Sequence, residues 1–161
     1  MLKLSKQEKS WIMYDWANSV YQLTIGSTIF PIYYNAVTRT ADNDIISFFG
    51  IKGINTVFYS WAIAVSYLFV AALSPLFSSI ADYTGLRKRF MMVFTWIGAF
   101  SCGMLFFFNK NTIELGLLAF TFATIGYGGS LVFYNSFLLR IFQDTLQTLF
   151  SPNHLHHLYR L

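Results

Sequence analysis

Four residues near the middle of the chain have the types and spacing that an electrostatic latch needs. Asp82 is followed by Gly85, where the backbone can turn, and then by Arg87 and Lys88. A carboxylate this close to cations can pair with one of them, or it can cap the N-terminus of an adjoining helix. The alternative is a solvated Asp82 beside a basic cluster that only sets the topology of the chain, and the residues alone leave both interpretations open.

A second polar set lies near the start of the chain, where Asp15, Asn18, Gln22 and Gly26 recur at the spacing of one helix face. Because the residues around them are largely apolar, we expect this face to point into a helix bundle or a water-filled cavity. Substrate binding and proton coupling are functions that such a face can serve. Two structural alternatives stay open: Asp15 could begin or cap the helix, and Asn18 and Gln22 could hold helices together.

No pattern in the sequence indicates an enzyme, a cofactor or a metal site. The chain has no glycine-rich phosphate loop, no nucleophile elbow, no metalloprotease helix and no pair of buried carboxylates. His154, His156 and His157 stand close together, but they have no acidic or cysteine partner nearby, so we expect no metal there. The single cysteine, Cys102, excludes an internal disulfide.

The composition is that of a membrane protein. Hydrophobic residues make up 55% of the 161 residues and charged residues only 11%, whereas a soluble domain has about 25% charged residues. The net charge of +4 could suit nucleic acid. The basic residues sit in short connections between apolar runs, however, so the expected partner is the lipid bilayer and not nucleic acid.

Four apolar stretches are long enough to span a bilayer as helices. Residues 38–54 form the longest expected loop, and residues 140–161 are too short and too polar to span. Pro31 predicts a kink or the outer end of the first span, and Pro75 predicts a kink. Residues 126–130 (GYGGS) predict a close-packing point or local flexibility. We therefore expect an all-α membrane protein with about four transmembrane helices, over roughly 17–37, 55–80, 90–108 and 113–139.

The basic residues predict the orientation of these spans. With both ends of the chain in the cytoplasm, the cytoplasmic side holds eight of the eleven basic residues, which satisfies the positive-inside rule. We therefore expect a multi-pass integral membrane protein with a cytoplasmic N-terminus. The cytoplasmic basic residues would be Lys3, Lys6, Lys9, Arg87, Lys88, Arg89, Arg140 and Arg160. On the other side would be Arg39, Lys52 and Lys110.

The latch segment resembles a transporter motif. In the major facilitator superfamily, the loop between the second and third helices carries the pattern G-x-x-x-D-x-x-G-R-[KR]. Asp82 and Gly85 match this pattern, and Arg87 and Lys88 match it with a shift of one residue. The departures from the pattern are at Ser78 and Leu86.

Three further stretches are similar to the vacuole-effluxer branch of that superfamily. They are residues 11–19 (WIMYDWANS), 28–33 (TIFPIY) and 133–138 (FYNSFL). The branch includes the autophagy-related amino-acid effluxers of fungal vacuoles and many bacterial transporters. The chain is thereby identified as similar to this branch over most of its length.

The resemblance implies a twelve-helix fold in two lobes, each built from inverted three-helix repeats. Residues 1–139 would be the first part of the N-terminal lobe, and the activity would be efflux of a small solute, with amino acids as the substrate class, by alternating access. The fourth helix helps to line the central cavity in that fold. The implied gating motif is Asp82, Gly85, Arg87 and Lys88, and the candidates for the substrate pathway are Asp15, Asn18, Gln22, Thr124 and Asn135. Bundle packing is the alternative for the last two.

Residues 140–161 resemble nothing in that branch. We interpret them as a non-family cytoplasmic tail of a truncated or frameshifted product in a bacterial inner membrane or a vacuolar membrane. Such a product would be inactive alone, and its partner would be the missing remainder of the transporter. The alternative is a small four-helix membrane scaffold or transporter subunit whose polar faces serve assembly.

Overall fold

A computed structural model describes residues 6–39 and 44–149, with side chains described over 9–39 and 44–136. Helices dominate the described chain, and one short hairpin interrupts them. In chain order the elements are α1 (Lys6–Val20), η1 (Tyr21–Ile29), α2 (Phe30–Thr38), β1 (Ile45–Phe48), β2 (Ile51–Ile54), α3 (Asn55–Thr84), α4 (Arg87–Met104), η2 (Leu105–Phe107) and α5 (Ile113–Leu149).

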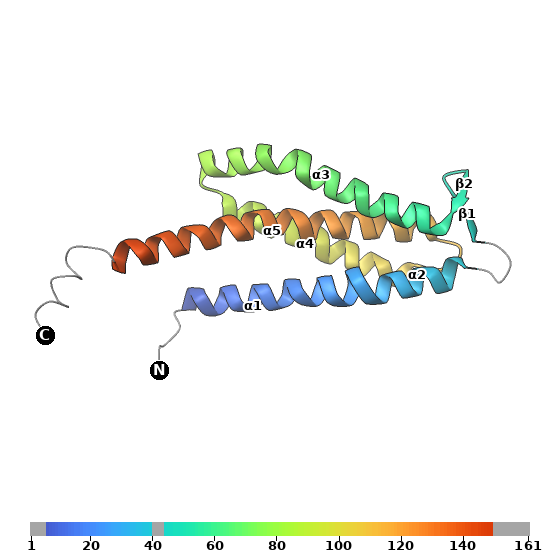
Figure 1. Ribbon diagram of the computed structural model, residues 1–161, viewed down its shortest axis with the longest axis horizontal. Helices are drawn as coiled ribbons and strands as arrows, with labels where there is room; N and C mark the ends of the chain where they lie inside the picture. Colours follow the sequence, from blue (N-terminus) through green and yellow to red (C-terminus); the bar gives the residue numbers. More distant parts are fainter. Residues whose placement is uncertain (1–5, 40–43, 150–161) are drawn as a thin grey trace, which may run out of the picture.

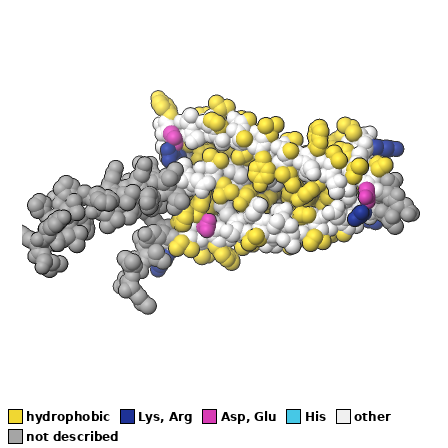
Figure 2. Space-filling model, in the orientation of Figure 1, with side chains coloured by type: hydrophobic (Ala, Val, Ile, Leu, Met, Phe, Trp, Pro, Cys, Tyr) yellow, Lys and Arg dark blue, Asp and Glu magenta, His cyan; other side chains and the backbone are white. Residues whose placement is uncertain are grey.

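The helices lie side by side in an elongated bundle. α1, η1 and α2 follow one another as a single helical segment, here called the first segment, and α3, α4 and α5 complete the bundle (Figure 1). α5 lies between α3 and the first segment, and it is far more buried than α3 or α4. On the face shown in Figure 2, charged side chains gather near the two ends and leave the middle apolar or uncharged, as a bilayer requires.

Helices that can cross a bilayer confirm the expected all-α membrane class. The first segment adds a further long helical stretch, made of α1, the π-helix η1 and α2. The expected first span therefore exists as a helix, although its three pieces are each short. Among the described residues, the helices long and apolar enough to span are Asn55–Thr84, Arg87–Phe107 and Ile113–Ser136.

The helices extend beyond the expected bounds. α3 continues to Thr84, α4 begins at Arg87, and α5 continues to Leu149, past the expected end near residue 139. The expected bounds followed the apolar side chains, but a helix ends where its backbone hydrogen bonds end, so polar residues can continue it into water. Residues 150–161, with the three histidines, lie outside the described residues.

The longest expected loop contains an antiparallel hairpin that the sequence analysis missed. β1 pairs with β2, and Ile45 lies opposite Ile54. Phe49 and Gly50 form the turn with φ angles of 48° and 82°, as a type I′ hairpin turn requires. Oε1 of Glu114 accepts a hydrogen bond from the backbone N–H of Phe49 at 2.8 Å, so the start of α5 holds the turn in place.

An aromatic core joins the first segment to α5 at the hairpin end. The rings of Phe30 and Phe120 stack with centroids 4.1 Å apart, and Phe108 packs on Phe30 at 5.8 Å. Nearby, the buried hydroxyl of Tyr34 donates to the backbone oxygen of Asn55 at 2.9 Å. Rings of this size dominate the energy of a small core, so this end of the first segment is firmly attached.

Neither proline ends its helix. Pro75 cannot donate to the carbonyl four residues earlier, and the Ser74 hydroxyl donates to that oxygen instead at 3.3 Å. Pro31 follows the π-helix, in which its missing N–H would have bonded the carbonyl of Gly26. The Tyr59 hydroxyl donates to this carbonyl at 3.5 Å. Side chains thus replace the lost backbone donors, and α3 changes direction along its length in Figure 1.

Glycines let α4 and α5 touch. A Cβ added at Gly126 would lie 2.4 Å from the backbone nitrogen of Gly98 and 2.7 Å from the backbone oxygen of Phe94. Such distances leave no room for a methyl group. The close-packing point expected from residues 126–130 is therefore confirmed.

We predict that Gly126→Ala separates α4 from α5 and lowers the free energy of unfolding by about 1–3 kcal/mol, because the new methyl group meets backbone atoms that cannot move aside. Gly103→Ala is the matched control in α4, since its Cβ would meet no atom within 4 Å. Thermal unfolding in detergent, followed by circular dichroism, compares the two variants. Equal stability of both would show that the glycine contact is unimportant.

Candidate functional site

The structure brings Asp82 and Arg87 together. Nε of Arg87 donates to Oδ1 of Asp82 across the turn between α3 and α4, and Gly85 occupies this turn with a φ of +69°. The Arg87 and Asp82 side chains are 28% and 47% exposed, so water screens the pair, and pairs of this kind contribute about 0–1 kcal/mol. Lys88 is exposed and forms no ion pair within the described ranges. A gating role for these residues stays a prediction.

The polar face of the first segment is partly buried. Asn18 is half-buried, whereas Asp15 and Gln22 are exposed. Gln22 lies over Gly26, because a Cβ at Gly26 would be 3.3 Å from Oε1 of Gln22. Both residues belong to η1, and π-helical turns are rare in proteins and frequent at functional sites. Gln22 and Gly26 thus lie on an element of unusual geometry, whereas Asp15 and Asn18 lie on the regular helix α1.

Aromatic rings join this face to α5. Trp11 stacks on Tyr134 with ring centroids 4.9 Å apart and planes inclined by 6°, and Tyr14 packs on the same ring at 5.3 Å. Further along both helices, Tyr21 packs on Tyr127 at 5.0 Å. We call this contact surface the seam, and its members are Trp11, Tyr14, Asn18, Tyr21, Tyr127 and Tyr134.

Hydroxyl groups link the first segment to its neighbours beside these rings. The Tyr21 and Thr124 hydroxyls are hydrogen-bonded at 3.4 Å, and the Tyr14 and Thr95 hydroxyls at 3.0 Å. Thr124 is buried and also donates to a backbone oxygen of its own helix at 2.9 Å. Asn135 is exposed. Of the two pathway candidates on α5, the structure therefore brings only Thr124 into contact with the first segment.

The seam contains polar atoms that are buried without a hydrogen-bond partner among the described residues. They are Nε1 of Trp11, Nδ2 of Asn18 and the hydroxyl oxygen of Tyr134. The carboxylate of Asp15 is close enough for its charge to act on the Tyr134 hydroxyl, although no hydrogen bond of ordinary geometry joins them. A buried polar group without a partner costs about 1–3 kcal/mol, so such groups usually meet water or a ligand.

Sequence reasoning named Asn18 and Thr124 as pathway candidates, and that role stays a prediction, but it missed the aromatic members of the seam. A signal for them was available: Trp11, Tyr14 and Tyr21 follow steps of three and seven residues and so share the helix face of Asn18. The partner rings on α5 had no comparable signal in the sequence. Periodicity in a sequence identifies the residues on one helix face, but it does not identify the helix against which that face packs.

A cavity elsewhere in the bundle is too small for a solute. It lies between α3, α4 and α5, has a volume of about 10 Å³ and is lined mainly by apolar side chains. That volume corresponds to about one water molecule. In the described part of the chain, no group of three His, Cys, Asp or Glu residues could hold a metal ion. The histidines at 154, 156 and 157 lie outside that part.

We predict opposite effects for two tyrosine variants. Tyr134→Phe should leave stability unchanged or raise it, because the buried hydroxyl has no hydrogen-bond partner among the described residues. Tyr34→Phe is matched, with 1% of the residue exposed against 4% for Tyr134, but its hydroxyl donates to Asn55, so its loss should destabilise the protein by about 1–3 kcal/mol. Thermal unfolding in detergent measures both. Equal destabilisation would mean that Tyr134 has a partner.

Comparison with known proteins shows the family. The family model described as "Vacuole effluxer Atg22 like" matches residues 5–154, and so continues beyond residue 139. The uncharacterized MFS-type transporter YxiO of Bacillus subtilis is 34% identical over 152 residues, which cover 94% of this chain and 34% of that protein. Autophagy-related protein 22 of Pyricularia oryzae is 29% identical over 159 residues, which cover 83% of this chain and 23% of that protein. No solved structure matches the chain.

The chain spans about a third or less of the length of these curated relatives. The family match nevertheless covers nearly all of the chain itself, and the long apolar helices agree with a multi-pass protein integral to a membrane. The expected resemblance to the vacuole-effluxer branch is thereby confirmed. This chain belongs to the family of vacuole effluxers like Atg22.

Proposed function

We propose that the chain is part of a transporter that exports a small solute by alternating access, with amino acids as the substrate class. The observation that carries the proposal is the seam, where buried donors without a partner among the described residues lie beside an exposed carboxylate. Polar groups at membrane depth are expensive and are usually retained for function. The transporter name of the Bacillus subtilis relative supports the same activity.

The substrate pathway would follow the seam. Asn18 and Thr124 line it, since Asn18 presents a buried amide and Thr124 bonds Tyr21 across it. Asp15, Gln22 and Asn135 are exposed and so accessible to a solute. We assign the first contacts of the solute to the exposed residues and the later ones to the buried residues.

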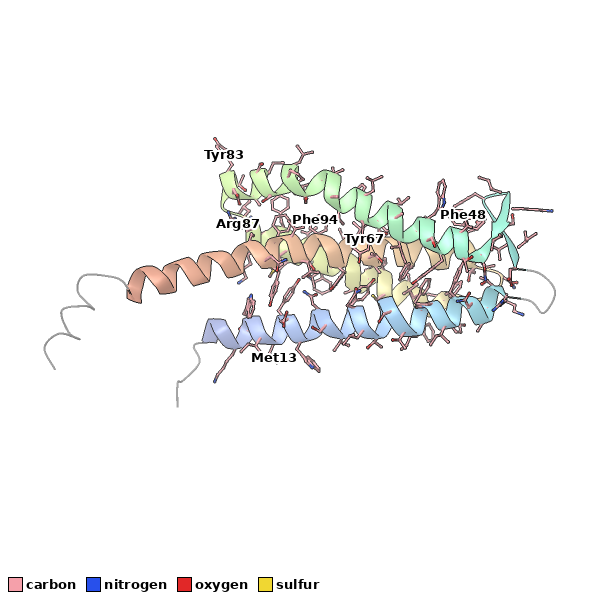
Figure 3. All side chains as sticks on the ribbon, in the orientation of Figure 1. Met13, Phe48, Tyr67, Tyr83, Arg87 and Phe94 are labelled. Carbon is pink, nitrogen blue, oxygen red and sulfur yellow. The ribbon has the colours of Figure 1, made fainter. Side chains whose placement is uncertain are left out.

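The latch would act at the cytoplasmic end, to which we assign the N-terminus. Arg87 lies at the same end of the bundle as the start of α1, and Phe48 lies at the opposite end (Figures 1 and 3). The excess of basic residues at the first of these ends supports the assignment. The exposed Asp82–Arg87 pair can open and close at small energetic cost, as a gate between two states requires.

We infer that the chain does not transport by itself. It spans about a third of the transporter relative, and transport by alternating access needs two repeats or lobes that move against each other. The proposed partner is the remainder of such a transporter. A four-helix scaffold or subunit is the alternative that the following experiment separates.

We predict that the chain transports only together with further helices of the same family. The rejoined transporter is this chain joined to the remaining helices of a family transporter. Vesicles reconstituted with the rejoined transporter and loaded with radiolabelled L-leucine should release it faster than protein-free vesicles, and vesicles with the chain alone should not. Leucine release by the chain alone would contradict the proposal, and no release by the rejoined transporter would favour the four-helix scaffold or subunit.

We predict that Asp82→Asn in the rejoined transporter slows leucine release by about 10-fold, the size of a typical coupling between two conformational states. Asp44→Asn is the matched control, because Asp44 is 43% exposed against 47% for Asp82 and pairs with Arg39 at 3.1 Å. Asp44 belongs to the connection between α2 and the hairpin. It should release leucine at the normal rate. An equal effect of both variants would show that the Asp82 pair has no special role.

A further inference from the structure

The seam has more hydrogen-bond donors than partners. Trp11 Nε1, Asn18 Nδ2 and the Tyr134 hydroxyl are buried and unpartnered among the described residues, and Tyr134 is only 4% exposed. An indole N–H and an amide NH₂ can only donate, and a phenol can donate as well. A carboxylate, which only accepts, is the group that best satisfies several donors at once.

Asp15 adds a negatively charged hydrogen-bond acceptor beside the donors of the seam. Its exposed carboxylate acts on the Tyr134 and Tyr127 hydroxyls through its charge, and it can accept hydrogen bonds from a cation. The rings of Tyr14 and Tyr134 pack together beside it at 5.3 Å and offer faces that attract an ammonium group. Asp15 would repel a simple anion, and a simple amine would leave the donors unsatisfied. A ligand with both charges fits the set.

The spacing of the two polar side chains fits charges that are close together. Asp15 and Asn18 stand three residues apart on α1, so their Cβ atoms lie about 5–6 Å apart on the helix surface. In an α-amino acid the ammonium and the carboxylate are attached to the same carbon atom. Both groups can therefore lie between these two side chains, and the ligand's own side chain is left outside the contacts.

We propose that Asp15, Asn18 and Tyr134 bind the ammonium and carboxylate groups of an amino acid. Asp15 accepts hydrogen bonds from the ammonium, and the Asn18 amide and the Tyr134 hydroxyl donate to the carboxylate. Trp11 stacks on Tyr134 and holds its ring in place. The inference rests on the proposed function and specifies which atoms recognise the substrate. Because the contacts end at the two charged groups, the site accepts amino acids with different side chains.

Binding of radiolabelled L-leucine to the 161-residue chain in lipid nanodiscs tests the site. Leucine should bind saturably, and 4-methylpentanoate and 3-methylbutylamine, each of which lacks one charge, should compete at least about 10-fold more weakly. Asp15→Asn, Asn18→Leu and Tyr134→Phe should each weaken leucine binding by about 10- to 100-fold, the effect of losing a hydrogen bond to a charged group.

Two control variants have the same Asp→Asn and Asn→Leu substitutions at positions outside the seam. Asp44→Asn and Asn111→Leu alter exposed or half-buried residues in the connections outside the first segment and α5, and they should bind leucine as the unaltered chain does. Circular dichroism and monodisperse elution establish that each variant is folded. Tyr134→Phe removes a hydroxyl that has no hydrogen-bond partner in the described part of the chain, so its effect on binding is separate from an effect on folding.

Each other result overturns the inference in a defined way. Unchanged leucine binding by the three seam variants would refute the proposed site, but it would not contradict amino-acid transport. Equal binding of the amine or the acid would refute recognition of both charges. A folded chain that binds no leucine would mean that water satisfies the seam donors. Failure of transport itself would appear separately, as absent leucine release by the rejoined protein.

Discussion

The close approach of α4 and α5 at Gly98 and Gly126 is the contact on which the rest of the bundle depends. Apolar helices gain little from leaving lipid, so van der Waals packing between backbones supplies much of their attraction. The two glycines allow that packing where a single methyl group would prevent it. Once α5 is held in this way, it becomes the buried centre of the bundle, and the side chains that it presents decide where the other helices lie.

The first segment is attached to this centre differently. Aromatic rings hold it, firmly at Phe30 and Phe120 and through the seam at Trp11 and Tyr134. Polar groups of the seam have no hydrogen-bond partner within the described ranges, and η1 departs from regular α-helical geometry. An attachment of this kind favours movement or ligand binding over rigidity. The bundle therefore combines a closely packed pair, α4 and α5, with the first segment, whose contact with α5 contains buried donors that have no partner among the described residues.

Sequence patterns were sufficient for the parts that depend on local chemistry. Run length and hydropathy predicted the membrane helices. The glycines predicted either a close approach or local flexibility, and the structure shows the close approach. The latch residues predicted either an ion pair or a solvated Asp82, and the structure shows the pair with Arg87. The hairpin escaped because its strands are short and its turn is held by Glu114, which is distant in the sequence. The seam escaped in part because Tyr134 meets Trp11 only after the chain has folded. The ends of α3 and α5 were placed too early, because hydropathy indicates which residues suit the apolar part of a bilayer, whereas a helix ends where its backbone hydrogen bonds end.

The most direct test of the account asks whether an amino acid occupies the seam. In a Cys102→Ser background, a cysteine introduced by Gln22→Cys lies on the polar face one turn from Asn18, and one introduced by Met13→Cys points away from the bundle (Figure 3). The rate of labelling by a small maleimide is measured with and without saturating L-leucine. The account predicts that leucine slows labelling at position 22 and not at position 13. Equal rates with and without leucine at both positions would contradict it.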